Sequence, residues 1–265
     1  MWFAALQFLV LLLGVALFLW LADTLPLAQS ALWVGVLCAG LWAVGALMQG
    51  RIGMLEVLLI EAAALATATS AAGLTGAHHL LKPLVMLIAI AYVAVHAYST
   101  GAKGLFFIYL LAALVYSLAG DVFLMFPGYF IPGLVSFLVA HLFYVALFKQ
   151  GTAWFPSRKA LVATLAVGSL MYAFLWSGLA PPLRGPVAAY VVVIALMAAQ
   201  AIGRAVVLHD RAAVGAAIGA CFFMLSDSLL ATNKFAFALP LAPLWVLGTY
   251  YTAQILIARH ARPVA

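Results

Sequence analysis

The sequence predicts an all-α fold, a polytopic bundle of about ten transmembrane helices. Hydrophobic residues make up 69% of the 265 residues and charged residues only 7%, whereas an ordinary soluble domain has about 25% charged residues. The mean hydropathy is correspondingly high, at +1.24. The apolar residues form runs of about 20, the length of helix that crosses a bilayer. Most of the chain is therefore expected to face lipid.

Proline, glycine and charged residues divide the apolar runs, because each of them ends a helix or is costly inside a bilayer. The first run has no Lys or Arg before it, unlike a signal peptide, so we expect it to be a retained helix. In chain order, the predicted helices and the residues that end them are 5–22 before Asp23, 30–48 before Gly50, 54–72 before Gly73, 80–98 before Gly101, 104–126 before Pro127, 131–149 before Gly151, 159–178 before Pro181, 186–207 before Asp210, 212–231 before Lys234, and 243–260 before Arg262.

The connections between these helices are short. Segments such as 99–103 and 127–130 are too short for a separate folded domain, and no low-complexity linker is present. The sequence therefore predicts a single transmembrane domain over residues 1–265.

The positive charge of the chain, +6 overall, lies on single Lys and Arg residues between apolar runs, which indicates topology determinants rather than a nucleic-acid surface. With ten helices, the termini and even-numbered loops carry nine cationic residues, and the odd-numbered loops carry three, Lys82, Arg184 and Lys234. The positive-inside rule then places both termini in the cytoplasm. An integral, multi-pass protein of a bacterial inner membrane is expected.

Two aspartates, Asp121 and Asp227, lie inside otherwise apolar predicted helices. A small residue precedes each, and leucine follows shortly after, as in a weak internal repeat of helices three to six and seven to ten. The two helices run in the same direction, so the carboxyl groups are expected at similar depth. Intramembrane carboxyl groups are functional candidates because of their cost. The alternative is a structural role, in which each pairs with Lys82, a tyrosine or a helix terminus.

Further polar side chains are candidates for support and substrate binding. His141 and Tyr144 share a helical face, as do Tyr250 and Gln254, and the alternatives are a core histidine in the first case and aromatic packing in the second. Lys82, before a proline in the expected first turn of its helix, is the preferred ligand for a phosphate or an aspartate. Arg184 and Lys234 are interpreted as interfacial snorkelling charges. The remaining candidates near this bilayer end or in the bundle interior are Tyr190 and Asn233.

Other chemistries lack their motifs. Cys38 and Cys221 have no second ligand nearby, and His78 and His79, expected in a loop, lack the further ligands that zinc needs. The Gly-x-Gly-Asp motif of intramembrane aspartyl proteases is absent, because Leu118 stands two residues before Gly120. No metal and no cofactor are expected.

Several segments together resemble the YhhN family of membrane proteins, the lysoplasmalogenases. The resemblance covers about residues 54–260, and its matching segments are Lys82-Pro83-Leu84, Ser117-Leu-Ala-Gly-Asp121-Val-Phe-Leu124, Ser136-Phe-Leu-Val-Ala-His141-Leu-Phe-Tyr144, Gly219-Ala-Cys-Phe-Phe-Met-Leu-Ser226-Asp227-Ser-Leu-Leu230 and Thr249-Tyr-Tyr-Thr-Ala-Gln254-Ile-Leu-Ile257.

This resemblance implies an eight-helix core, with residues 1–50 as a two-helix N-terminal extension. It also implies hydrolysis of the vinyl ether bond of lysoplasmalogen, which yields a fatty aldehyde and glycerophosphocholine or glycerophosphoethanolamine. The partners are then a lysophospholipid substrate and membrane lipid, with no nucleic acid and no protein partner.

The implied reaction suits two carboxyl groups. Protonation of the vinyl ether creates an oxocarbenium ion, and glycosidases use paired carboxyl groups around a similar state. We therefore expect one of Asp121 and Asp227 to be the general acid and the other to stabilise the cation and direct water. His141, Tyr144, Tyr190 and Tyr250 would orient these groups. The alternatives are a proton-coupled transporter of a small solute or lipid, and a structural or lipid-scaffolding protein.

Overall fold

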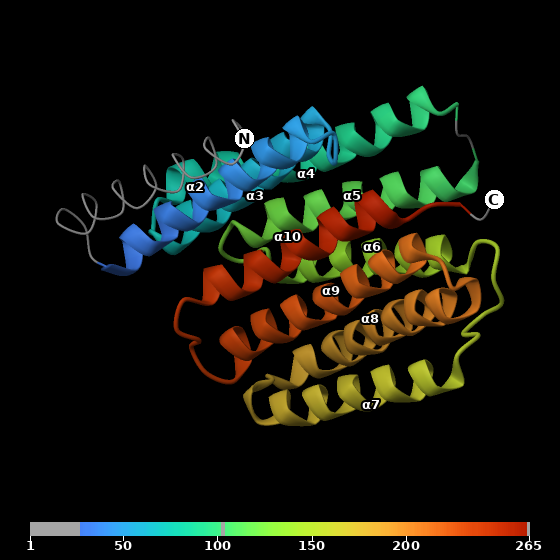
Figure 1. Ribbon diagram of the computed structural model, residues 1–265. Helices are drawn as coiled ribbons and strands as arrows, with labels where there is room; N and C mark the ends of the chain where they lie inside the picture. Colours follow the sequence, from blue (N-terminus) through green and yellow to red (C-terminus); the bar gives the residue numbers. More distant parts are fainter. Residues whose placement is uncertain (1–26, 102–103, 264–265) are drawn as a thin grey trace. The chain divides into compact units, whose positions relative to one another are not determined.

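The computed structural model describes residues 27–101 and 104–263, and all regular structure in these two ranges is helical (Figure 1). The predicted first helix, 5–22, lies outside the described residues. The described helices are α2 (Leu27–Met48), α3 (Met54–Ala71), α4 (Thr75–Ser99), α5 (Leu105–Leu124), α6 (Phe130–Lys149), α7 (Arg158–Leu175) with a short 3₁₀ turn (Trp176–Gly178), α8 (Pro181–Leu208), α9 (Arg211–Phe235) and α10 (Ala242–His260).

Seven of the described helices, α3 to α9, are long and apolar enough to cross a membrane. This confirms the predicted fold class of an all-α bundle of transmembrane helices. The protein is therefore an integral, multi-pass membrane protein. The loops between these helices are short, as the sequence predicts.

One predicted helix start is wrong at α4, which begins at Thr75 instead of residue 80. Gly73 has a φ of 72°, a left-handed conformation suited to glycine, and it turns the chain so that α4 starts immediately. His78 and His79 consequently lie in α4 and not in a loop. Pro83 is inside the helix and not in its first turn, a position that transmembrane helices tolerate.

Two further boundaries differ from the prediction. α8 begins at Pro181 rather than residue 186, because prolines fit the first turn of a helix, where no N–H is needed. α9 continues to Phe235, past the predicted end at 231, and the Thr232 hydroxyl donates a hydrogen bond to the Ser228 carbonyl within this last part. Asn233 and Lys234 therefore lie on the helix instead of in a loop.

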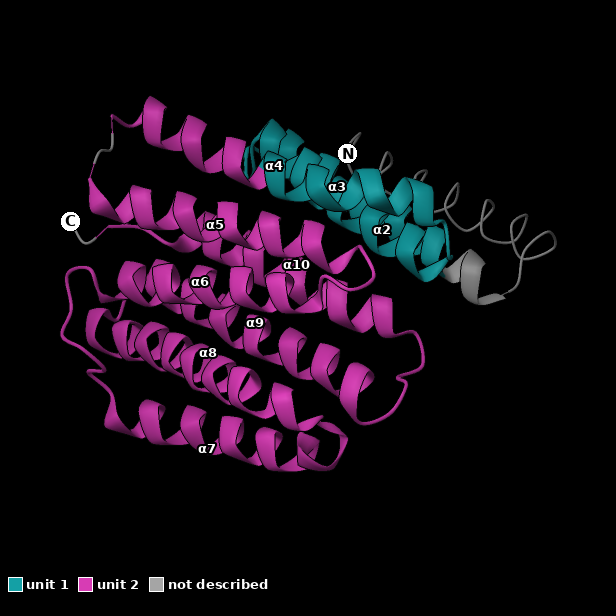
Figure 2. Cartoon of the chain, turned by 180° about the vertical axis from the view of Figure 1, so that it is seen from behind, with its two compact units in different colours: residues 1–88 teal, residues 89–265 magenta. Residues whose placement is uncertain are grey.

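The chain divides into two compact units, with the division inside α4 between Ile88 and Ala89 (Figure 2). In the first unit, α2 packs against α3 through a buried cluster of Ala43, Ala46, Ile52 and Val57. In the second unit, the closest helix pairs are α5 with α6 and α9 with α10, and α8 packs against α6, α7 and α9.

Glycines set the close approach of the helix pairs in the second unit. A Cβ on Gly120 of α5 would lie 2.5 Å from the Phe137 ring of α6. On α9, a Cβ on Gly219 would lie 3.0 Å from the Ala253 carbonyl oxygen of α10. Small residues allow transmembrane helices to pack closely. Gly215 likewise faces His260 of α10, so both glycines of α9 serve packing within the chain.

Buried polar side chains form hydrogen bonds with the backbone of the loops at one end of the second unit. Gln200 accepts a hydrogen bond from the Phe155 backbone N–H, at 2.7 Å, and donates one to the Ala153 carbonyl. Arg204 donates to the Gln150 carbonyl and, at 2.9 Å, to the Arg262 carbonyl. These bonds satisfy buried polar groups that would otherwise be costly in a membrane protein.

Candidate functional site

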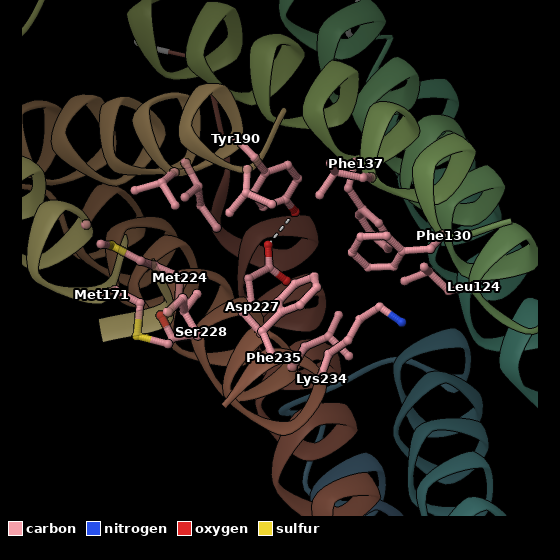
Figure 3. A pocket seen from close by; sticks show the side chains of 18 residues that line it. Leu124, Phe130, Phe137, Met171, Tyr190, Met224, Asp227, Ser228, Lys234 and Phe235 are labelled. Atoms are coloured by element: carbon pink, nitrogen blue, oxygen red, sulfur yellow. Dashed lines mark hydrogen bonds between the residues drawn. The ribbon is translucent and has the colours of Figure 1, made fainter. Parts of the chain in front are cut away.

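Asp227 of α9 faces a cavity in the second unit. Its Oδ2 accepts a hydrogen bond of 2.5 Å from the hydroxyl of Tyr190 on α8 (Figure 3). The Tyr190 side chain is 9% exposed and that of Asp227 15% exposed, so the pair is largely shielded from its surroundings. The site thus places a carboxyl group, fixed by a phenol, in the wall of an internal space.

Helices α5 to α9 all contribute to the cavity, and its lining is largely hydrocarbon. Among the described residues that line it, the polar or charged side chains belong to Tyr190, Asp227, Ser228 and Lys234. A pocket with so few polar groups is typical of a site for an apolar ligand. The main apolar lining residues are Leu124, Phe130, Leu134, Phe137, Met171, Leu175, Val187, Val191, Ile194, Met224, Leu230 and Phe235.

His141 of α6 lies next to this pair and is fully buried. Its Nε2 is 3.8 Å from Asp227 Oδ2, beyond hydrogen-bond distance. The imidazole ring meets the Tyr190 ring edge to face, with 5.2 Å between the ring centroids. Neither ring nitrogen has a hydrogen-bond partner among the described residues. The imidazole is thus positioned to interact with the carboxyl group or with a bound molecule.

Asp121 lies in the last turn of α5, 2% exposed, and is held by a second set of polar side chains. Its Oδ2 accepts a hydrogen bond of 2.6 Å from the Tyr250 hydroxyl. That hydroxyl in turn accepts one from Gln254 Nε2, at 3.2 Å, which confirms that Tyr250 and Gln254 share a face of their helix. Gln254 Oε1 accepts a further bond, of 2.7 Å, from the Tyr144 hydroxyl. A continuous chain of hydrogen bonds therefore links α5, α6 and α10.

Asp121 and Asp227 belong to neighbouring polar sets, because the Phe223 ring packs against members of both. Only Asp227, however, is among the residues that line the cavity. The Phe223 ring of α9 lies between the two polar sets, 4.6 Å from the His141 ring and 5.4 Å from the Tyr250 ring, measured between centroids. The site is thus asymmetric, with one carboxyl group at the cavity wall and the other enclosed by its hydrogen-bonding partners.

The remaining polar residues singled out from the sequence are Lys82, Asn233 and Arg184. Lys82 belongs to the first compact unit, so its relation to the aspartates stays a prediction. Asn233 does not line the cavity, and its Oδ1 accepts a hydrogen bond of 2.8 Å from the Leu239 N–H, which fastens the loop between α9 and α10. Arg184 stacks on Trp176, with its guanidinium carbon 4.1 Å from the ring centroid. In the described part of the chain, no group of three or more His, Cys, Asp or Glu residues is clustered as a metal site.

Most of the apolar residues around the site are not predicted from the sequence. Phe223 stands four residues before Asp227, and this helical spacing places the two on one face of α9, a signal that was available. Met171 and Leu175 of α7 do line the cavity, unlike Phe223, but nothing in their local sequence separates them from lipid-facing residues.

Comparison with known proteins gives a consistent family assignment. The model of the YhhN family matches residues 77–261. Human lysoplasmalogenase TMEM86A is 37% identical over 153 residues, which cover 56% of this chain and 62% of that protein. Human lysoplasmalogenase TMEM86B is 37% identical over 149 residues, 56% of this chain and 61% of that protein.

A bacterial relative is more distant. The lysoplasmalogenase of Mycobacterium tuberculosis is 30% identical over 157 residues, covering 56% of this chain and 58% of that protein. The matched part thus spans about 60% of the length of these relatives. No solved structure matches the chain.

Proposed function

Since the chain belongs to the YhhN family, we propose that it hydrolyses the vinyl ether bond of lysoplasmalogens. The products are a fatty aldehyde and glycerophosphocholine or glycerophosphoethanolamine. The single observation that carries this proposal is the carboxyl group of Asp227 in the wall of a hydrocarbon-lined cavity. Relatives named lysoplasmalogenase, at 30–37% identity, support the same activity.

The cavity suits the substrate because a lysoplasmalogen has one long hydrocarbon chain. The chain would lie among side chains such as Met171, Val191 and Ile194, and the vinyl ether at its polar end would reach Asp227. Burial of apolar surface favours such binding, at about 0.8 kcal/mol for each CH₂ group.

The reaction begins with transfer of a proton from the acid to the β-carbon of the vinyl ether. The resulting oxocarbenium ion is attacked by water, and loss of a proton gives a hemiacetal. The hemiacetal then collapses: its hydroxyl group loses a proton as the aldehyde C=O forms, the C–O bond to glycerol breaks, and the glycerol oxygen takes up a proton. One water is consumed, and no electrons are gained or lost overall.

We assign the proton transfer to Asp227, because it faces the cavity. The apolar lining disfavours a charged carboxylate, so substrate would meet the neutral acid. After transfer, the Asp227 carboxylate stabilises the adjacent cation and accepts a proton from the attacking water, which restores the acid. Tyr190 holds this carboxyl group in place through its hydrogen bond.

Asp121 acts in this proposal as the second carboxyl group, behind the cavity wall. An ionised Asp121 would stabilise positive charge that develops nearby. Tyr250, Gln254 and Tyr144 fix its orientation through their hydrogen bonds. His141 is assigned a positioning role for Asp227 and the attacking water, because it lies 3.8 Å from Asp227 Oδ2.

The fate of isotopes tests this function. Purified protein in detergent is given 1-alkenyl-glycerophosphoethanolamine in D₂O, with the ester-linked lysophospholipid as a control substrate. The proposal predicts a fatty aldehyde with one deuterium on the carbon next to the carbonyl, and no product from the ester. An unlabelled aldehyde would exclude protonation of the β-carbon. Unchanged lipid that has crossed the bilayer of proteoliposomes would indicate transport instead of hydrolysis.

We further propose that the protein lies in a bacterial inner membrane with both termini in the cytoplasm. The excess of cationic residues at the termini and even-numbered loops supports this orientation. A C-terminal fluorescent protein fusion should fluoresce and an alkaline phosphatase fusion at the same position should be inactive. The opposite pair of results would reverse the orientation.

A further inference from the structure

Lys234 is the only cationic residue among the described residues that line the Asp227 cavity. It lies in the last turn of α9, and its ammonium nitrogen is 4.4 Å from the centroid of the Phe130 ring of α6. Figure 3 shows its amine extending toward Phe130 and Leu124, on the far side of the cavity from Tyr190. The cavity thus carries its acid and its cation at separate places.

A second cavity also has Lys234 in its lining. The two cavities share Leu124, Phe130, Leu230 and Lys234 in their linings. The second is otherwise lined by residues 125–128, the turn between α5 and α6. Because this turn joins two membrane-spanning helices, it lies toward one membrane surface. The two cavities therefore adjoin at Lys234, and the second lies toward the end of the bundle.

The spacing along α9 relates the two charged groups. Asp227 and Lys234 stand two helical turns apart, so they lie on nearly the same face and about 10 Å apart along the axis. A lysoplasmalogen has its phosphate separated from the vinyl ether by the glycerol backbone. A ligand that places its vinyl ether at Asp227 would therefore direct its phosphate toward Lys234.

From this geometry we propose that Lys234 binds the phosphate of the lysophospholipid headgroup and so sets the position of the vinyl ether at Asp227. The inference rests on the proposed function, and it replaces the interpretation of Lys234 as a snorkelling charge. A lysine ammonium is a common phosphate ligand. Its position over the Phe130 ring restrains it beside the cavity.

Arg184 provides a matched control, because it is a second cation near the end of a neighbouring helix, α8. It lines neither cavity. Its guanidinium stacks on Trp176, and its Nε donates a hydrogen bond of 3.3 Å to the Leu179 carbonyl. Loss of a cation at this end of the molecule can therefore be compared with loss of the cation at the cavity.

The test measures binding of two saturated ether lipids that cannot be hydrolysed, 1-O-alkyl-glycerophosphoethanolamine and 1-O-alkylglycerol, to purified protein in detergent. Lys234→Met should weaken binding of the phosphate-bearing lipid about tenfold, which corresponds to about 1.4 kcal/mol. It should leave 1-O-alkylglycerol binding unchanged, and Lys234→Arg should keep most of the affinity. Arg184→Met should bind both lipids like the wild type.

Equal weakening of both lipids by Lys234→Met, or no weakening of either, would overturn the proposal. Competition experiments with soluble phosphates distinguish binding of the lipid headgroup from binding of a free anion. If inorganic phosphate or glycerophosphoethanolamine displaced the lipid equally from wild type and Lys234→Met, the anion would bind elsewhere and the proposal would fail. Because this test needs no turnover, its result is separate from that of the isotope experiment, which decides whether vinyl ethers are hydrolysed.

Discussion

Tyr190 donates a hydrogen bond of 2.5 Å to Oδ2 of Asp227, and this bond joins α8 to α9 at the wall of the cavity. The phenol is the direct hydrogen-bonding partner through which the scaffold orients the proposed acid. Orientation matters because proton transfer to carbon needs the acid within reach of the reacting atom.

Tyr190→Phe should therefore lower kcat for lysoplasmalogen about tenfold or more, since a hydrogen bond to an ionisable group is worth about 1.5–3 kcal/mol. Aldehyde release over a range of substrate concentrations measures this. Tyr172→Phe is the control, because the Tyr172 hydroxyl donates its hydrogen bond to the Arg184 carbonyl, outside the cavity lining. Equal activity of the two variants would remove Tyr190 from the site.

Adjacent tyrosines on α10 offer a sharper pair of variants. The Tyr250 hydroxyl bonds to Asp121 at 2.6 Å, whereas the Tyr251 hydroxyl is buried with no hydrogen-bond partner among the described residues. Tyr250→Phe should lower kcat about tenfold, since about 1.4 kcal/mol corresponds to a factor of ten. Tyr251→Phe should retain wild-type kcat in the same aldehyde assay. A reversed order would show that the hydrogen bond to Asp121 does not support catalysis.

Chain-length selectivity should follow the shape of the cavity. Met171 of α7 lines it, whereas the neighbouring Leu170 is 72% exposed and faces away from the bundle. Met171→Trp should reduce turnover of long-chain lysoplasmalogen several-fold more than turnover of a short-chain analogue, because the indole occupies space needed by the hydrocarbon. Leu170→Trp should leave the ratio of the two rates unchanged. The same ratio in both variants would place the hydrocarbon chain elsewhere.

The packing of α5 against α6 supports the last turn of α5, which carries Asp121. A Cβ on Gly120 would overlap the Phe137 ring, which is itself packed against Phe223 and Tyr250. Gly120→Ala should destabilise the protein by about 1–3 kcal/mol, as overpacking does. Gly185→Ala, in an exposed part of α8 with nothing within 4 Å of the new Cβ, should not destabilise it. Thermal unfolding in detergent measures both, and equal transition temperatures would contradict this role of Gly120.

The fold followed from the sequence because hydropathy dominates in a membrane protein. The apolar runs located α3 to α9, and the helical spacing of Tyr250 and Gln254 predicted their shared face. Helix ends were less predictable. The sequence places Pro83 in the first turn of its helix, but proline is also tolerated inside a transmembrane helix. A proline alone therefore does not show where such a helix begins.

The contacts of the site depend on tertiary packing, which local sequence does not encode. Tyr190 stands 37 positions from Asp227, so no helical periodicity relates the two. Lys234 has the sequence context of an interfacial lysine, and only its place in the lining of the Asp227 cavity distinguishes it from Arg184. The asymmetry of the two aspartates was equally hidden, because both stand after a small residue in an apolar helix.

Replacement of each aspartate by asparagine tests most directly whether the two carboxyl groups carry out vinyl ether hydrolysis. Asp210→Asn is the control, because Asp210 caps the first turn of α9 and asparagine is an equally good cap. Aldehyde release from lysoplasmalogen should fall by a factor of about 100 or more in Asp227→Asn and in Asp121→Asn, with folding intact, and should persist in Asp210→Asn. Wild-type activity in either of the first two variants would contradict the two-carboxyl mechanism.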